Sequence, residues 1–178
     1  KHFPGHGSVV ADSHVDDVTD PRPLMEIREN DLQPFEQLMP ALDALMIAHV
    51  VYPAVDDLPA GYSSVWLKDI LRREMGYDGV VISDDLGMHA AKAIGGVRRR
   101  ALACLDAGCD LVLVCDPGEV DRLVADAPLG RDSAAVEIER LYGVPTVDRH
   151  ELAEVRREGL RDWGHGRQSL ERLGESWA

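Results

Sequence analysis

The stretch GVVISDDLGM, residues 79–88, decides the fold class of this chain. Its β-branched residues form a short, nearly continuous apolar run, which is typical of a strand buried on both faces of a parallel sheet. Asp84 and Asp85 follow this run directly, where the strand opens into a loop. In a (β/α)8 barrel the functional groups lie on loops at the C-terminal ends of parallel strands, so the stretch predicts both a fold and a site.

Two further apolar runs have the same character. They are Ala44–Val51 and Asp110–Cys115, and with Gly79–Ser83 they make three expected strands. Helical patterns alternate with them at 31–39, 64–75 and 97–107, which indicates an α/β fold with parallel strands. After Pro117 the pattern is helical, with candidates at 118–126, 133–142 and 149–163, and the polar segment 164–178 forms a tail.

Helix ends can also be expected from single residues. Asp31 is placed to cap the helix over 31–39, Pro34 is acceptable in its first turn, and Pro40 should end it. Ser63 or Ser64 should cap the helix over 64–75, and Gly76 should end it. Gly108 should end the helix over 97–107.

The composition restricts the function classes. The 178 residues carry a formal net charge of −13, so there is no basic field to attract nucleic acid or an anionic membrane. No apolar run approaches the ~18 residues of a membrane span. The chain opens at Lys1, so any signal peptide would lie outside the sequence shown.

Three cysteines, Cys104, Cys109 and Cys115, lie in or beside an apolar run. We interpret them as buried thiols of a protein from a reducing compartment. Their spacing lacks the close pairing of cysteines that structural zinc sites use.

Asp84 is the first candidate for chemistry. A carboxylate at a strand end can attack an anomeric carbon and carry a covalent glycosyl intermediate, as in retaining glycosidases. The alternative is that it caps a helix or pairs with a base. His14 is the second candidate, because an imidazole can protonate a leaving oxygen and then deprotonate water, and Asp12 could orient its ring. The alternative there is an exposed loop histidine beside an acid.

The first seven residues, KHFPGHG, supply further polar groups. Lys1 and His2 could hydrogen-bond sugar hydroxyls at a strand end. A metal such as zinc, collected by His2 and His6 together with Asp12 and His14, is a second interpretation, although Pro4-Gly5 argues against a helix that presents both histidines. His49 ends the expected strand Ala44–His49 and should point toward the same site, as a pocket wall or a core histidine.

Taken in order, the segments KHFPGHG, DSH, AHVVYP, WLKDILRREMGYDGVVISDDLGM and LDAGCDLVLVCD closely resemble glycoside hydrolase family 3, over roughly residues 1–116. Within it they look most like the β-N-acetylglucosaminidases of bacterial peptidoglycan recycling. The resemblance implies a retaining exo-glycosidase with Asp84 as nucleophile and a His14–Asp12 acid/base pair. Lys1 and His2 would bind the N-acetylglucosamine hydroxyls, with no metal or organic cofactor.

The resemblance also implies an architecture. Residues 1–163 would form the C-terminal portion of a (β/α)8 barrel, with the N-terminal strands absent from this chain, and 164–178 would be the tail. The expected partner is a small carbohydrate, such as N-acetylglucosamine joined to anhydro-muramic acid, and the expected location is the bacterial cytoplasm. The alternative function is a non-catalytic half-barrel that binds carbohydrate or a protein partner.

Overall fold

A computed structural model describes residues 1–125, 129 and 141 of the chain, all within one compact unit, Lys1–Tyr142. The helix expected over 149–163, nearly all of the one over 133–142, the tail 164–178 and the boundary before it lie outside the described residues. Within the described residues no helix is long and apolar enough to cross a membrane.

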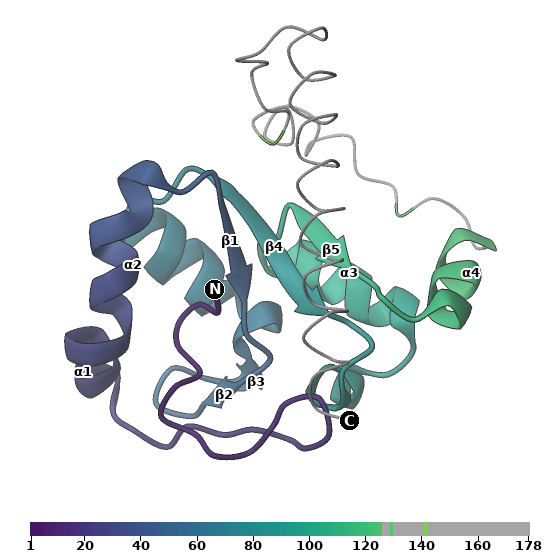
Figure 1. Cartoon of the computed structure of the whole chain (residues 1–178), viewed down its shortest axis with the longest axis horizontal. Helices are drawn as coiled ribbons and strands as arrows, with labels where there is room; N and C mark the ends of the chain where they lie inside the picture. The colour runs from purple at the N-terminus through teal and green to yellow at the C-terminus, as the bar shows by residue number, and fades with distance from the viewer. Residues whose placement is uncertain (126–128, 130–140, 142–178) are drawn as a thin grey trace, which may run out of the picture. The chain divides into compact units, whose positions relative to one another are not determined.

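Three parallel strands form the central sheet. They are β1 (Ala44–Ile47), β4 (Val80–Asp85) and β5 (Leu111–Leu113), in the order β1-β4-β5 (Figure 1). Ala44 pairs with Val80, and Ile82 pairs with Leu111. The three predicted strands and their parallel arrangement are therefore confirmed, and the backbone carboxyl ends of all three meet at one edge of the sheet.

One predicted strand is longer than the observed one. The run Ala44–Val51 was expected as a single strand, but the chain leaves the sheet after Ile47 and forms an antiparallel hairpin of β2 (Val51–Tyr52) and β3 (Asp56–Pro59). The N–H of Val55 donates to the carbonyl of Tyr52 at 2.8 Å and closes the turn. Pro53 lies in this turn, where its missing N–H costs no ladder hydrogen bond.

The helix predicted over 31–39 begins seven residues earlier than expected, at Leu24. It runs through α1 (Leu24–Ile27), a π-helical segment η1 (Arg28–Leu32), α2 (Gln33–Leu38) and a 3₁₀ turn η2 (Met39–Ala41). Asp31 is thus inside the helix and is not its cap. Pro34 is also internal, and the wider turns of η1 precede it, where a regular helix would clash with the proline ring.

The other helices begin and end close to prediction. Segment η4 (Val65–Glu74) is capped by Ser63, whose Oγ accepts from the N–H of Trp66 at 3.2 Å. Gly76 follows it with φ +73°, and Gly108 follows α3 (Val97–Ala107) with φ +129°. The last described helix is α4 (Pro117–Ala125). Two 3₁₀ segments were not predicted: η3 (Ala60–Tyr62) and η5 (His89–Ile94).

The N-terminal segment lies on the open edge of β1. The N–H of Phe3 donates to the carbonyl of Met46 and the N–H of Ala48 donates to that of Phe3, both at 2.8 Å. Phe3 forms a parallel bridge with Ile47, so it extends the sheet by one residue. Lys1 and His2 directly precede this bridge.

An aromatic cluster holds Phe3 in place. Its side chain is fully buried, with ring centroids 5.3 Å from Phe35 of α2 and 6.0 Å from Trp66 of η4, both edge to face. Tyr52 contacts Trp66 from the hairpin at 5.2 Å. Four elements therefore meet on one aromatic core directly below the N-terminal loop.

The cysteine interpretation is right for two residues and wrong for one. Cys104 and Cys109 are buried thiols, but Cys115 is exposed. It lies two residues after β5, where the chain has already left the sheet.

We expect Phe3→Ala to lower the free energy of unfolding by about 3–5 kcal/mol, the cost of removing a large aromatic side chain from a packed core. Chemical denaturation of the variant and the parent chain measures the difference. Val10→Ala is the matched control, because Val10 is fully exposed and its loss should change the value by less than about 0.5 kcal/mol. A loss below about 1 kcal/mol for Phe3→Ala would show that the N-terminal segment is not part of the core.

Candidate active site

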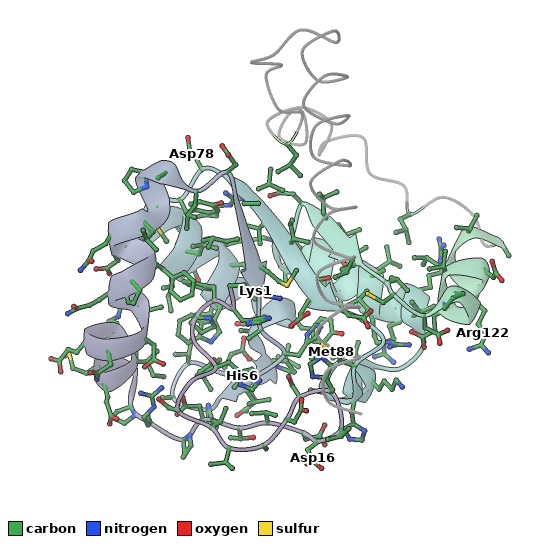
Figure 2. All side chains as sticks on the ribbon, in the orientation of Figure 1. Lys1, His6, Asp16, Asp78, Met88 and Arg122 are labelled. Carbon is green, nitrogen blue, oxygen red and sulfur yellow. The ribbon has the colours of Figure 1, made fainter. Side chains whose placement is uncertain are left out.

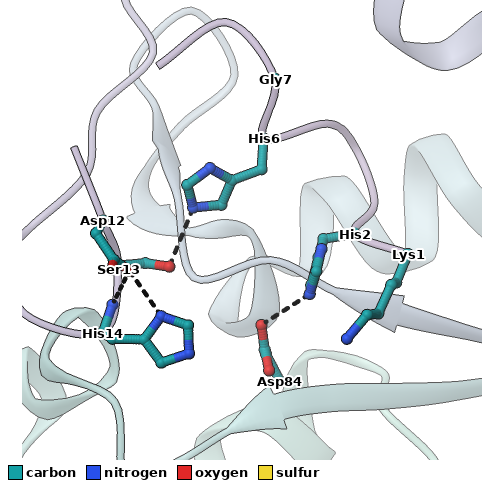
Figure 3. Close-up of a pocket in the computed structure, with 8 residues that line it drawn as sticks. All are labelled: Lys1, His2, His6, Gly7, Asp12, Ser13, His14 and Asp84. Atoms are coloured by element: carbon teal, nitrogen blue, oxygen red, sulfur yellow. Dashed lines mark hydrogen bonds and ion pairs between the residues drawn. The ribbon is translucent and has the colours of Figure 1, made fainter. Parts of the chain in front are cut away.

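A cavity of about 470 Å³ lies at the C-terminal edge of the sheet. Its lining comes from the N-terminal loop, the following turn and the end of β4 (Figure 3). The lining residues are Lys1, His2, His6, Gly7, Asp12, Ser13, His14 and Asp84. The cavity is at one end of the sheet, because Asp78, which precedes β4, lies at the opposite end from His6 (Figure 2). All five residues proposed from the sequence as site residues therefore share one cavity.

Asp84 reaches this cavity from the end of β4, where it is the next-to-last residue of the strand. One carboxylate oxygen, Oδ1, accepts the N–H of Asp85 at 2.8 Å. The other, Oδ2, lies 3.5 Å from Nε2 of His2, and the side chain is 15% exposed. The carboxylate is thus held at one oxygen, with the second beside the lining residues (Figure 3).

Asp85 stabilises the same loop from the other side. Its Oδ1 accepts the N–H of Gly87 at 3.0 Å and the N–H of Cys115 at 2.9 Å. The first bond lies within the loop after β4, and the second joins the end of β4 to the segment that follows β5. This role of Asp85 was not predicted, although an Asp two residues before a Gly is a turn signal that points to it.

His49 lies beneath Asp84 and is absent from the described lining of the cavity. Its Nε2 is 3.2 Å from the backbone carbonyl of Asp84, and its ring stacks on Tyr62 at 5.6 Å. Because a carbonyl only accepts, Nε2 must carry the hydrogen, and Nδ1 has no hydrogen-bond partner among the described residues. Burial lowers the pKa of His49 and outweighs the opposing effect of Asp84. His49 is therefore a core histidine and not a pocket wall.

The structure brings Asp12 and His14 together. Oδ1 of Asp12 lies 2.6 Å from Nδ1 of His14 and also accepts the backbone N–H of His14 at 2.9 Å. Both hydrogen bonds lower the pKa of the Asp12 carboxyl, and the bond from the backbone N–H of His14 has the larger effect. The carboxylate therefore stays charged and fixes the ring, leaving Nε2 of His14 as the nitrogen for other chemistry. Both side chains are exposed, at 63% for Asp12 and 71% for His14.

His2 and His6 form the upper wall of the cavity with Lys1. The two histidine rings meet edge to face at 6.4 Å. Burial is the main cause that lowers the pKa of His2, and the charge of Asp84 opposes it. In the part of the chain that the structure describes, no three His, Cys, Asp or Glu side chains converge as a metal site would require.

The loop that carries these residues is fixed at Gly5. The hydroxyl of Tyr52 donates to the carbonyl of Gly5. Gly5 has φ +149°, and a Cβ there would approach Oδ1 of Asp31 to 2.6 Å, so only glycine fits. Asp31 in turn lies 2.8 Å from Arg22, which also pairs with Asp20 at 2.7 Å. The ion cluster of Asp20, Arg22 and Asp31 was not predicted from the sequence, because Asp31 was expected to cap a helix.

The arrangement combines two chemically different groups around one space. A carboxylate stands at a strand end, where it can act as a nucleophile or stabilise positive charge. Across the cavity, an imidazole oriented by a carboxylate can transfer a proton near neutral pH. Lys1 and His2 add hydrogen-bonding groups for a polar, hydroxyl-rich ligand.

Comparison with known families agrees with this arrangement. Residues 1–140 match the family described as glycosyl hydrolase family 3 N terminal domain. The chain belongs to this family. The mixed helices and strands of the structure are consistent with this membership.

Family 3 relatives include two bacterial proteins named beta-hexosaminidase. The protein of Stenotrophomonas maltophilia (strain R551-3) is 59% identical over 122 residues, which are 68% of this chain and 36% of that protein. The protein of Idiomarina loihiensis is 46% identical over 167 residues, which are 92% of this chain and 51% of that protein. The chain therefore spans between about a third and a half of these family 3 enzymes.

A solved structure has a similar fold. NagZ from Neisseria gonorrhoeae, in complex with N-trifluoroacetyl-D-glucosamine, matches with a TM-score of 0.74 and 41% identity. The match covers 87% of this chain and 44% of that protein.

We expect His49 to make stability depend on pH. Its pKa in the folded state lies below the usual 6.5, so the unfolded chain binds the proton more readily. The stabilisation by neutral His49 is complete above pH 6.5 and is lost as the pH falls toward the lower folded-state pKa. In His49→Gln, unfolding measured from pH 7.5 to 5 should show a smaller loss of stability on acidification, about 1.4 kcal/mol less for each unit by which the pKa is lowered.

An exposed apolar residue supplies the control for this measurement. Val10→Ala should keep the pH dependence of the parent chain, since Val10 carries no titratable group and its side chain is fully exposed. An equal pH dependence in His49→Gln and the parent would contradict the burial argument.

Proposed function

We propose that this chain carries the catalytic groups of a retaining exo-β-N-acetylglucosaminidase, which removes terminal β-linked N-acetylglucosamine. The supporting observation is the shared cavity, where Asp84 from β4 and the hydrogen-bonded Asp12–His14 pair stand around one space. The names of the relatives, beta-hexosaminidase and NagZ, point to the same reaction class.

In the first step, Asp84 is the nucleophile. Oδ2 attacks the anomeric carbon as the bond to the leaving oxygen breaks, forming a covalent glycosyl–Asp84 ester. The anchoring of Oδ1 by the N–H of Asp85 leaves one oxygen for this attack. His49 and Asp85 hold the backbone from below and from the side, which fixes the carboxylate before substrate arrives.

His14 is the acid and base of the proposal. As imidazolium it gives the proton on Nε2 to the leaving oxygen, and as neutral imidazole it then takes a proton from the water that cleaves the ester. Asp12 holds Nδ1 and stabilises the imidazolium. A neutral histidine near Asp84 also avoids the repulsion that a second carboxylate would bring.

Lys1 and His2 are the proposed contacts to the sugar hydroxyls. We place the natural substrate among muropeptides in which N-acetylglucosamine is joined to anhydro-muramic acid, in bacterial cytoplasmic cell-wall recycling. The N-trifluoroacetyl-D-glucosamine bound by the Neisseria relative supports the sugar part of this assignment.

The proposed architecture is the C-terminal portion of a (β/α)8 barrel. Its support is the parallel order β1-β4-β5, the crossover helices between the strands and the cavity at their C-terminal edge. The second candidate is a non-catalytic half-barrel that binds carbohydrate or a protein partner. The observation that favours it is the exposure of the proposed acid/base pair, 63% for Asp12 and 71% for His14.

The deciding experiment is intact mass measurement after incubation with a fluorinated N-acetylglucosaminyl fluoride, which glycosylates readily and deglycosylates slowly. We expect one sugar adduct on the peptide that contains Asp84. Asp84→Asn should form no adduct and should lose about 10³-fold or more in turnover of an aryl N-acetylglucosaminide. An adduct on another residue, or full turnover by Asp84→Asn, would refute Asp84 as the nucleophile.

Leaving-group dependence tests His14. His14→Ala should lose about 10²-fold on a substrate with a poor leaving group, the low end of the contribution of a general acid. On an activated dinitrophenyl glycoside the loss should stay below about tenfold, because that leaving group needs no proton. Equal losses on both substrates would exclude His14 as the leaving-group acid. Loss of activity on treatment with a chelator would instead favour the metal interpretation.

A further inference from the structure

Ser13 differs sharply from its two neighbours. Asp12 and His14 expose 63% and 71% of their side chains, whereas Ser13 is only 4% exposed. The sequence analysis assigned no role to this residue. A buried hydroxyl between two exposed polar side chains indicates that the middle of the turn is fastened to the rest of the molecule.

Hydrogen bonds on both sides of Ser13 provide the fastening. Its Oγ lies 3.0 Å from Nε2 of His6, on the loop that also carries Lys1 and His2. Its carbonyl accepts the N–H of Ala90 at 3.2 Å. The carbonyl of His14 accepts the N–H of His89 at the same distance. The turn is therefore held between the N-terminal loop and η5.

The chain between His6 and Ser13 provides a weaker connection. Gly7 and Ser8 are exposed, and the side chain of Val10 is fully exposed. The backbone path from His6 to the turn passes through these exposed residues and through Val9 and Ala11, which are partly buried against the core. The His6–Ser13 side-chain bond spans the same gap directly (Figure 3).

We propose that the His6–Ser13 hydrogen bond is a latch that fixes the Asp12–His14 pair over the cavity. His6 and Ser13 are thus positioning residues. The consequence for catalysis rests on the proposed function of His14. A general acid must lie within hydrogen-bond distance of the leaving oxygen, so loosening its turn reduces the fraction of molecules ready to transfer the proton.

Amide hydrogen exchange tests the latch without any enzymatic activity. The relevant amides are those of Val15 and Asp16, which donate to the carbonyl of Asp12, and those of His89 and Ala90. Ser13→Ala should accelerate their exchange about three- to tenfold, the effect of one lost hydrogen bond. The amide of Ala48, bonded to Phe3, should not change.

Matched variants separate the latch from a general loss of packing. Ser8→Ala removes an exposed hydroxyl from the same loop and should leave all four amides unchanged. Ser13→Thr keeps the hydroxyl and should restore slow exchange. His6→Phe should accelerate the same amides, and the double variant His6→Phe/Ser13→Ala should exchange no faster than either single variant, because both remove one interaction.

A kinetic measurement tests the positioning role. Ser13→Ala should lower kcat about tenfold or more on a glycoside with a poor leaving group, a part of the contribution of the acid, and less than about threefold on the dinitrophenyl glycoside. KM should stay within about twofold, because the contacts to the sugar are unchanged.

The outcomes distinguish the latch from the proposed function. Unchanged exchange in Ser13→Ala, or additive effects in the double variant, would overturn the latch. Faster exchange together with equal kinetic losses on both substrates would overturn the positioning role. If the parent chain forms no adduct and shows no turnover, the proposed function fails, and the exchange data alone decide whether the latch exists.

Discussion

The site depends on the burial of one side chain, that of Phe3. Its ring packs against Phe35 of α2 and Trp66 of η4, and its backbone is hydrogen-bonded to Met46 of β1 and to Ala48 directly after β1. Aromatic residues are only 5% of this chain, and several of them are gathered in the cluster around Phe3. Lys1 and His2 directly precede Phe3, so the sugar-binding side of the proposed site continues from the edge of the sheet.

The two sides of the cavity differ in how rigidly they are held. Asp84 lies at the end of a strand, with His49 below it and Asp85 joining its loop to the segment after β5. The opposite side is a turn with two exposed functional side chains and one buried serine. This division suits the proposed chemistry, because a nucleophile needs a fixed position before attack, whereas an acid and base must serve a leaving group and then a water molecule.

Electrostatics divides the work in a similar way. The low pKa of Asp12 follows from two hydrogen bonds donated by one neighbouring residue, so the pair needs no burial to stay formed. His49 shows the opposite case, since burial keeps it neutral and lets it donate to the carbonyl of Asp84 without bringing charge under the carboxylate. Histidines thus serve two different purposes within one site.

The sequence by itself determined the three parallel strands and the Ser63 and Gly108 helix ends, because hydrophobic runs and terminal residues act locally. The five residues of the candidate site were proposed from single residues and from the family resemblance, and the tertiary structure brings them to one cavity. It misplaced the start of the first helix, since Asp31 has the composition of a cap, and only tertiary structure pairs Asp31 with Arg22. The hairpin after Ile47, the buried position of His49 and the His6–Ser13 bond were likewise decided by tertiary structure. Each depends on contacts between segments whose spacing along the chain carries no periodic signal, so only the packed fold could bring them together.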